Sequence, residues 1–292
     1  MRRFFRLILI LILIGGGLFW FLTRPSPLPE TALDGLVADP AHGALVFHAA
    51  GCASCHASPG AEGEATLILA GGQSFPSPFG SFLAPNISPD PAHGIGDWSA
   101  LDLANAMTRG VSPEGAHYFP AFPYTSYTRA SLQDVVDLHA YLAALPPSAT
   151  PNQPHDVGFP FNIRRNLGGW KLLFFKEGWV TTADSPEIER GRYLVEALGH
   201  CGECHTPRNA LGGSDYGQWL AGAPDPSGKG KVPDIRPGPL GWSAQDLAYY
   251  FETGFTPDYD SAGGHMAHVV QNLAKLPAED RAAIAAYLLA LK

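Results

Sequence analysis

Two short stretches decide the fold, "CASCH" at Cys52–His56 and "CGECH" at Cys201–His205, and they contain all four cysteines of the 292 residues. In each, two thiols three positions apart are followed directly by an imidazole. Thiols at this spacing can each add to one vinyl group of a porphyrin, and the histidine then reaches the iron. The sequence therefore predicts two haem c groups. They are attached at Cys52, Cys55, Cys201 and Cys204, with His56 and His205 as proximal iron ligands.

Two other kinds of site use paired cysteines. A thioredoxin-like redox pair belongs to a βαβ setting, which neither motif has around it. A zinc site with four cysteine ligands does not call for a histidine after both pairs. Two attachment motifs with no cysteine left over favour the haem interpretation.

The N-terminus reads "MRRFFRLILILILIGGGLFWFLTRPSP", an apolar run from Phe4 to Leu22 broken only by Arg6. At about 1.5 Å per residue the run spans most of a ~30 Å hydrocarbon core. More positive charge precedes it than follows it, which places the N-terminus in the cytoplasm. No small-residue cleavage site follows, so residues 1–24 are interpreted as an uncleaved signal anchor rather than a cleaved signal peptide. The chain would cross the inner membrane once, with its haem domains in the periplasm.

The remaining composition is that of a folded chain with many loops. Only 16% of residues are charged, and 33 Gly and 27 Pro favour short helices joined by rigid connections. The net charge of −8 argues against nucleic acid as a partner.

An internal repeat relates the two motifs. "DWSALDLANAMTRGVSPEG" around Trp98 aligns with "GWSAQDLAYYFETGFTPDY" around Trp242, at an offset of 242 − 98 = 144. In both copies a helix precedes the motif, with Asp39 or Ser185 as its N-cap and a proline directly after it. Gly43 and Gly191 in these helices are expected to let a second helix cross closely. A middle helix is predicted to begin at Ser99 or Ser243, and an amphipathic helix ends each copy. The predicted fold is all-α, with two class I cytochrome c-like domains in tandem after the anchor. The domains are 25–145 and 185–292.

The predicted inter-domain linker, 146–184, begins as a Pro-rich segment and continues with aromatic residues too apolar for a free tether. It is expected to pack on one domain or at the seam between them. Arg164 and Arg165 are candidates for contacts with haem propionates. The alternative is that both are solvated surface arginines.

"LAGGQSFPSPFGSFLAPNISPDPAHGIGDWS", "PAFPYTSYT" and "FPFNIRRNLGGW" resemble the multihaem cytochrome c subunits of membrane-bound alcohol, gluconate and aldehyde dehydrogenases, and the C-terminal stretch from Gly263 does too. The resemblance covers nearly all of the chain after the anchor. It departs in two respects. Well-known members have three haems, and their "PAMPY", whose Met is an axial ligand, is "PAFPY" here.

The resemblance and the loop position identify Met266 as the expected distal ligand of haem 2, with His268 as its competitor. The repeat pairs Met266 with Phe122, which cannot ligate iron. His117 is therefore the expected distal ligand of haem 1, and its counterpart in the second copy is Ser261. The alternatives for haem 1 are Met107, His93 or no protein ligand.

The family resemblance implies an electron-transfer protein, without substrate chemistry of its own, that accepts electrons from a periplasmic dehydrogenase and passes them to a respiratory-chain acceptor such as a cytochrome or oxidase. The alternative is a dihaem enzyme, of peroxidase or thiosulfate-oxidising type, acting at an open or switchable haem 1. A fixed structural subunit of a larger membrane complex is a third hypothesis.

Overall fold

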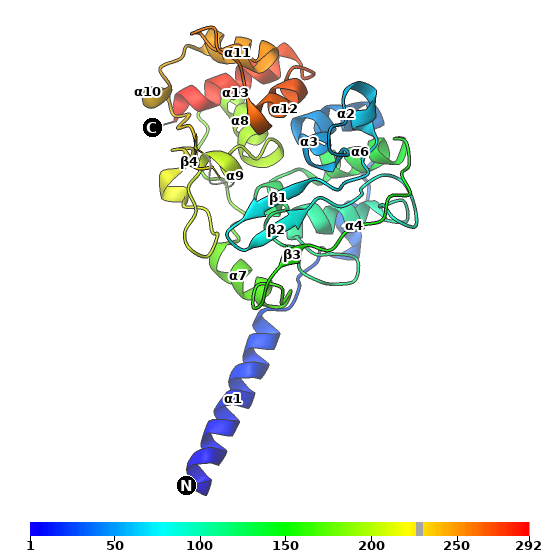
Figure 1. Cartoon of the computed structure of the whole chain (residues 1–292), viewed down its shortest axis with the longest axis vertical. Helices are drawn as coiled ribbons and strands as arrows, with labels where there is room; N and C mark the ends of the chain where they lie inside the picture. Colours follow the sequence, from blue (N-terminus) through cyan, green and yellow to red (C-terminus); the bar gives the residue numbers. More distant parts are fainter. Residues whose placement is uncertain (226–229, 292) are drawn as a thin grey trace.

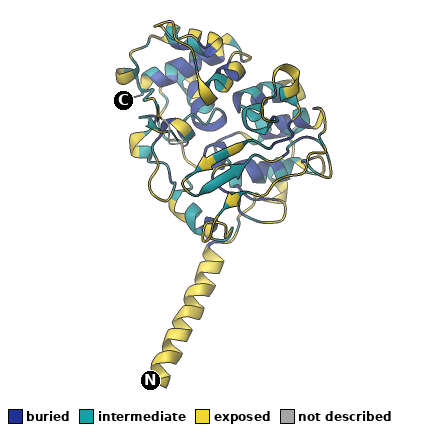
Figure 2. Cartoon of the chain, in the orientation of Figure 1, coloured by how far each residue is buried: buried dark blue, intermediate teal, exposed yellow. Residues whose placement is uncertain are grey.

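The computed structural model describes residues 1–225 and 230–291, and most of its regular structure is helical (Figure 1). Helix α1 (Arg2–Leu22) extends away from a folded body formed by the rest of the chain. None of its residues is buried, as the yellow helix in Figure 2 shows. Among the described residues it is the one helix long and apolar enough to cross a membrane. The predicted N-terminal apolar helix is thus present.

Each half of the body is built around one crossed pair of helices. In the first half α2 (Pro40–Ala49) packs on α6 (Leu132–Ala143), and in the second α8 (Pro186–Arg192) packs on α13 (Ala278–Ala290). The short helices that carry the cysteine motifs follow α2 and α8. The remaining helices are α3 (Cys52–His56), α4 (Ala100–Ala104), α5 (Tyr124–Tyr127), α7 (Asn166–Phe174), α9 (Gly202–His205), α10 (Pro237–Leu240), α11 (Ala244–Thr253) and α12 (Gly264–Leu273). Three 3-10 turns (Glu30–Leu33, Gly63–Leu67, Tyr216–Gln218) and two π turns (Asn105–Arg109, Tyr193–Leu198) complete the helical structure.

The helix starts predicted from the sequence are confirmed. Ser99 and Ser243 begin α4 and α11 with the same capping box, in which the serine hydroxyl accepts from the N–H of Asp102 or Asp246 and the carboxylate accepts in return. Asp39 and Ser185 cap α2 and α8, each with a proline directly after it.

A glycine at each helix crossing allows the two backbones to touch. A Cβ on Gly43 would lie far inside van der Waals contact with the carbonyl oxygen of Asp137, and one on Gly191 would do the same with that of Ala283. Any side chain here would force α2 from α6, or α8 from α13. The predicted close crossings are confirmed.

The two halves also share a loop after the middle helix. A β-bridge joins Val111 to His117 in the first half and Phe255 to Ser261 in the second. The loops therefore correspond residue by residue at the offset of 144, and His117 occupies the place of Ser261.

Short strands are a departure from the predicted all-α class. β1 (Ser74–Ser77), β2 (Gly80–Leu83) and β3 (Asp156–Val157) form an antiparallel sheet in the order β1-β2-β3. β4 (Ala223–Pro224) and β5 (Lys231–Val232) form a second, two-stranded one. The all-α prediction was wrong to this extent, because the pairing of β3 with β2 joins segments far apart in the sequence.

The segment between the halves is fixed to both of them rather than free, since Val180 and Thr181 near its end donate to the Glu196 carboxylate of the second half. β3 lies in it, and the Asn86 side chain donates to the carbonyls of Ser148 and Thr150 at 2.7 and 2.9 Å. Its second part forms α7, which Figure 1 places at the base of the body beside the inner end of α1.

Replacing Gly43 by Ala should lower the free energy of unfolding by about 2 kcal/mol, since the added methyl group overpacks the α2–α6 crossing. Gly238→Ala is the matched control, because nothing lies within 4 Å of the Cβ position there. Denaturant unfolding measures both. Equal stability of the two variants would contradict the proposed role of Gly43.

Candidate functional site

Each cysteine motif forms one short helical turn that brings its side chains together. The imidazole Nδ1 of His56 lies 2.8 Å from the carbonyl oxygen of Pro85, and that of His205 lies 2.8 Å from the carbonyl oxygen of Pro233. Donation to a carbonyl keeps the proton on Nδ1 and leaves the Nε2 lone pair available to a metal. Both histidines are thus oriented as iron ligands.

A glycine later in the chain forms a backbone hydrogen bond with each motif histidine. The N–H of Gly71 donates to the carbonyl of His56, and that of Gly222 to the carbonyl of His205, at 2.7 Å in both cases. The two glycines have φ of +72° and +79°, and a Cβ on either would strike the backbone of the chain crossing beside it. The same backbone arrangement around the histidine, formed by one proline carbonyl and one glycine N–H, therefore occurs in both halves.

The protonation of these groups fits haem attachment better than redox exchange. Burial lowers the pKa of His56 and of His205, which keeps the imidazoles neutral. Burial raises the pKa of the Cys52 thiol to about 12 and of the Cys55 thiol to about 11. Redox-active pairs instead contain a thiol of lowered pKa.

The two motifs meet at a seam between the halves. Near the carbonyl oxygen of Ala50, the ring Nε2 of His200 and the hydroxyl of Tyr127 each lie 3.3 Å away. The Tyr127 and His200 rings pack edge to face, with centroids 5.5 Å apart. Residues directly preceding each motif are thus in contact.

Glu203, inside the second motif, forms hydrogen bonds across the seam to residues of the first half. Its carboxylate accepts from the hydroxyls of Thr125 at 2.8 Å and Ser126 at 3.2 Å, and it pairs with Arg208. Burial alone would raise the pKa of Glu203, but Arg208 and the Thr125 hydroxyl hold it below its usual value. The carboxylate is therefore charged.

Asn272 on α12 completes the seam, since its side-chain amide lies 3.0 Å from the Ser54 hydroxyl and 3.2 Å from His48 Nδ1. Sequence reasoning missed these seam residues. One signal was available, because the first motif has Ser54 where the second has the charged Glu203.

The distal side is formed differently in the two halves. Met266 lies in α12 rather than in the loop that the sequence predicted, and it packs against the hydrophobic core that residues of both halves form. Its counterpart Phe122 packs beside Tyr127 at a centroid distance of 5.9 Å. Tyr127 lies close enough to Cys52 and Cys55 to interact with both thiols. Phe122 thus lies one side chain away from the first attachment motif.

The structure gives His117 another partner. Its Nε2 lies 2.9 Å from the carbonyl oxygen of Thr23, at the end of α1, and its ring is buried against Gly168. Nδ1 is buried without a hydrogen-bond partner. Ligation by Nε2 requires that the bond to Thr23 opens, so the assignment of His117 stays a prediction.

The other expected site residues are placed as follows. Met107 is buried in the core, and His93 lies at the surface 3.2 Å from Asp90. Arg164 donates to the carbonyl of His117 and stacks over Phe119. Arg165 stacks over Trp20 of α1. The propionate contacts of the two arginines stay a prediction, because both have partners elsewhere.

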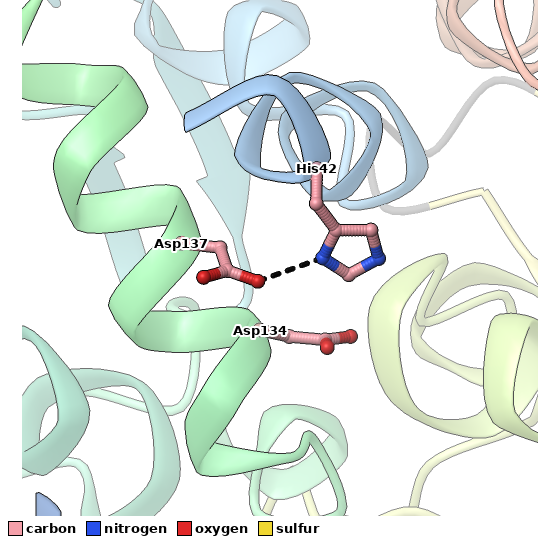
Figure 3. A group of neighbouring side chains, drawn as sticks. All are labelled: His42, Asp134 and Asp137. Atoms are coloured by element: carbon pink, nitrogen blue, oxygen red, sulfur yellow. Dashed lines mark hydrogen bonds and ion pairs between the residues drawn. The ribbon is translucent and has the colours of Figure 1, made fainter. Parts of the chain in front are cut away.

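His42, Asp134 and Asp137 gather between α2 and α6 (Figure 3). His42 Nδ1 lies 2.8 Å from Asp137, which also accepts from the Asp39 N–H, and Asp134 accepts from the Tyr193 hydroxyl at 2.5 Å. Each carboxylate already accepts a hydrogen bond from a protein group, so these residues are interpreted as contacts that join helices rather than as a metal site.

Two covalent attachment motifs with oriented histidines define a c-type cytochrome. A family model described as cytochrome c matches residues 40–146. The chain is 56% identical over 289 residues to a protein of Cereibacter sphaeroides described as "Diheme cytochrome c-type", covering 99% of this chain and 98% of that protein. The chain belongs to the cytochrome c family and carries two haem c groups.

Subunits of dehydrogenases are also similar. The fructose dehydrogenase cytochrome subunit of Gluconobacter japonicus is 39% identical over 248 residues, covering 82% of this chain and 50% of that one. The gluconate 2-dehydrogenase cytochrome c subunit of Pantoea cypripedii is 35% identical over 264 residues, covering 85% and 58%. The chain spans about half the length of these two relatives.

Glu203→Gln should lower the free energy of unfolding by about 2 kcal/mol, since it removes the charged acceptor at the seam. It should also raise the reduction potential of haem 2, because a negative charge beside an iron stabilises its oxidised form. Unfolding and redox titration measure the two effects. Glu189→Gln, with a side chain 70% exposed, is the control; if the two variants have the same potentials, Glu203 does not act on the haem.

Proposed function

We propose that this chain is a dihaem electron carrier held at the periplasmic face of the inner membrane by α1, with two cytochrome c units at 25–145 and 185–292. The repeated arrangement supports two units, since the His56–Pro85 and His205–Pro233 bonds are both 2.8 Å long and span 29 and 28 residues. The segment 146–184 joins the units and is bonded to both of them.

In this proposal the residues of each motif have separate tasks. Cys52 and Cys55 hold one haem by thioether bonds, and Cys201 and Cys204 hold the other. Each haem, when bound, supplies a one-electron couple at its iron. His56 and His205 present Nε2 as the proximal ligand, and the carbonyl bonds at Nδ1 keep the rings from turning.

One observation carries the function: the attachment motifs abut. The contacts of His200 with Ala50 and of Glu203 with Thr125 bring the two attachment motifs close together, so haems held by these motifs would lie on either side of the seam. Electrons can therefore pass from one haem to the other inside the protein. A separate shuttle between the two sites is not needed.

The relatives suggest the class of protein that donates electrons to this chain. The printed names of the similar subunits attach them to fructose, gluconate and alcohol dehydrogenases. By this likeness the electron donor is a periplasmic dehydrogenase, and the acceptor is a cytochrome or oxidase of the respiratory chain. Nothing in this scheme gives the chain substrate chemistry, so the enzyme alternative is not favoured.

The anchor is proposed to remain attached to the mature protein. Thr23, directly after α1, is only 2% exposed, because α7 and the loop of His117 cover it. Cleavage after the apolar run would leave these residues without their partners. The arrangement thus supports a signal anchor over a cleaved signal peptide.

The distal ligands are proposed to be Met266 at haem 2 and His117 at haem 1. A Met/His iron has a higher potential than one with two imidazoles. Electrons would then pass downhill from haem 1 to haem 2.

Carbon monoxide binding to the reduced protein tests this function and these ligands together. The wild type should bind little CO rapidly, because both irons have a sixth ligand. Met266→Ala, His117→Ala and Met107→Ala are compared with it by optical spectra. The first two should each open half of the haem, and Met107→Ala serves as a core control. Rapid binding to half of the wild-type haem would contradict a pure carrier, and a low-spin His117→Ala variant would remove His117 as a ligand.

A further inference from the structure

Apolar side chains are exposed together around α7. Phe159 is 81% exposed, Leu172 62% and Leu173 65%. Contacts connect their neighbours: Phe161 packs on Phe79 at 5.0 Å, and Trp170 Nε1 donates to the carbonyl of Leu211, itself 55% exposed. We call this set the collar; it consists of Phe159, Phe161, Leu172, Leu173 and Leu211.

The collar lies at the base of the body, where α1 leaves it (Figure 1). α7 packs directly on the last turns of α1. A Cβ on Gly169 would lie 3.5 Å from the ring of Phe19, and Gly168 is against the carbonyl of Thr23. Gly168 allows α7 to approach α1 more closely than any side chain would, and Gly169 lies at ordinary van der Waals distance from it.

Polar contacts fix the same junction. Arg165 Nε donates to the Thr23 hydroxyl at 3.1 Å, the guanidinium bonds the carbonyl of Trp20, and its carbon lies 4.0 Å from the centre of the Trp20 ring. His117 holds the Thr23 carbonyl from the other side. The angle and height of α1 relative to the body are therefore set by several bonds rather than by a flexible tether.

This junction determines the depth of α7. Its contacts reach back to Phe19, inside the apolar run, and include Trp20, a residue type that prefers the boundary between lipid and water. From Phe19 to Thr23 a helix rises about 6 Å. If α1 spans the bilayer, α7 lies within one helical turn of its outer surface.

We propose that the collar rests in the outer interface of the same bilayer that α1 crosses, as a second, monotopic contact with lipid. The inference relies on the proposed membrane anchor. The bilayer is the occupant favoured by the structure, because α7, which carries Leu172 and Leu173, packs on the apolar helix α1, and Trp20 lies at that junction. The contact would hold the two haem units at one fixed height and tilt over the membrane.

Spin labels on the full-length haem protein in phosphatidylcholine–phosphatidylglycerol vesicles test the proposal. All four native cysteines form thioethers, so one introduced cysteine is the single reactive thiol. The variants are Leu173→Cys and Phe159→Cys in the collar, Leu18→Cys in α1, and Tyr249→Cys as an exposed control on α11. The measurement compares the access of lipid-soluble oxygen with that of a water-soluble nickel chelate.

Labels in the collar should resemble the Leu18 label, with oxygen access several-fold above that of the Tyr249 label and little nickel access. Free nickel access at Leu173 and Phe159, with Leu18 in lipid, would overturn the collar and leave the anchor intact. Nickel access at Leu18 as well would overturn the anchor itself. Collar labels shielded from both reagents would assign the surface to a protein partner, which would also overturn the proposal.

Discussion

The contact between the two cysteine motifs is the constraint on which the rest of the structure depends. It is small: one carbonyl at Ala50, two rings, and a carboxylate held by hydroxyls of the opposite half. Because Glu203 carries charge, its partners cannot be lost without leaving that charge poorly solvated. The seam thus fixes how the two haem-bearing halves face each other. The helix crossings at Gly43 and Gly191 then hold each motif against its own half.

Much of this arrangement could be predicted from local chemistry. The motif spacing identified the haem attachment, Ser99 and Ser243 as N-cap residues located the starts of the middle helices, and Gly43 and Gly191 located the crossings. The offset of 144 correctly paired His117 with Ser261, because the loop between the middle helix and that position has the same length in both copies. These features depend on residues close together in the sequence or on a direct internal comparison.

The remaining features depend on contacts between distant segments, which carry no local signal. β3 pairs with a strand more than 70 residues earlier, and the Thr23 carbonyl meets a histidine 94 residues later. The exchange of Met for Phe at position 122 suggested that the axial ligand had moved to His117. In the structure the Nε2 of the same histidine bonds the Thr23 carbonyl at the end of α1, and Nδ1 is the ring nitrogen without a partner among the described residues. Phe122, the counterpart of Met266, packs beside Tyr127, and Tyr127 lies near the thiols of the first attachment motif.

In the proposed function, the contact between the two haem-binding halves would give a short internal path for electrons, and the junction of the body with the apolar helix would hold the carrier at a membrane surface. The central claim is that the two haems exchange electrons through the seam. Injecting one electron per molecule by pulse radiolysis into the oxidised full-length protein tests it most directly, with each haem followed by its absorption. The seam predicts redistribution between the haems at a rate independent of protein concentration. A rate proportional to protein concentration would show that electrons pass only between molecules and would contradict the account.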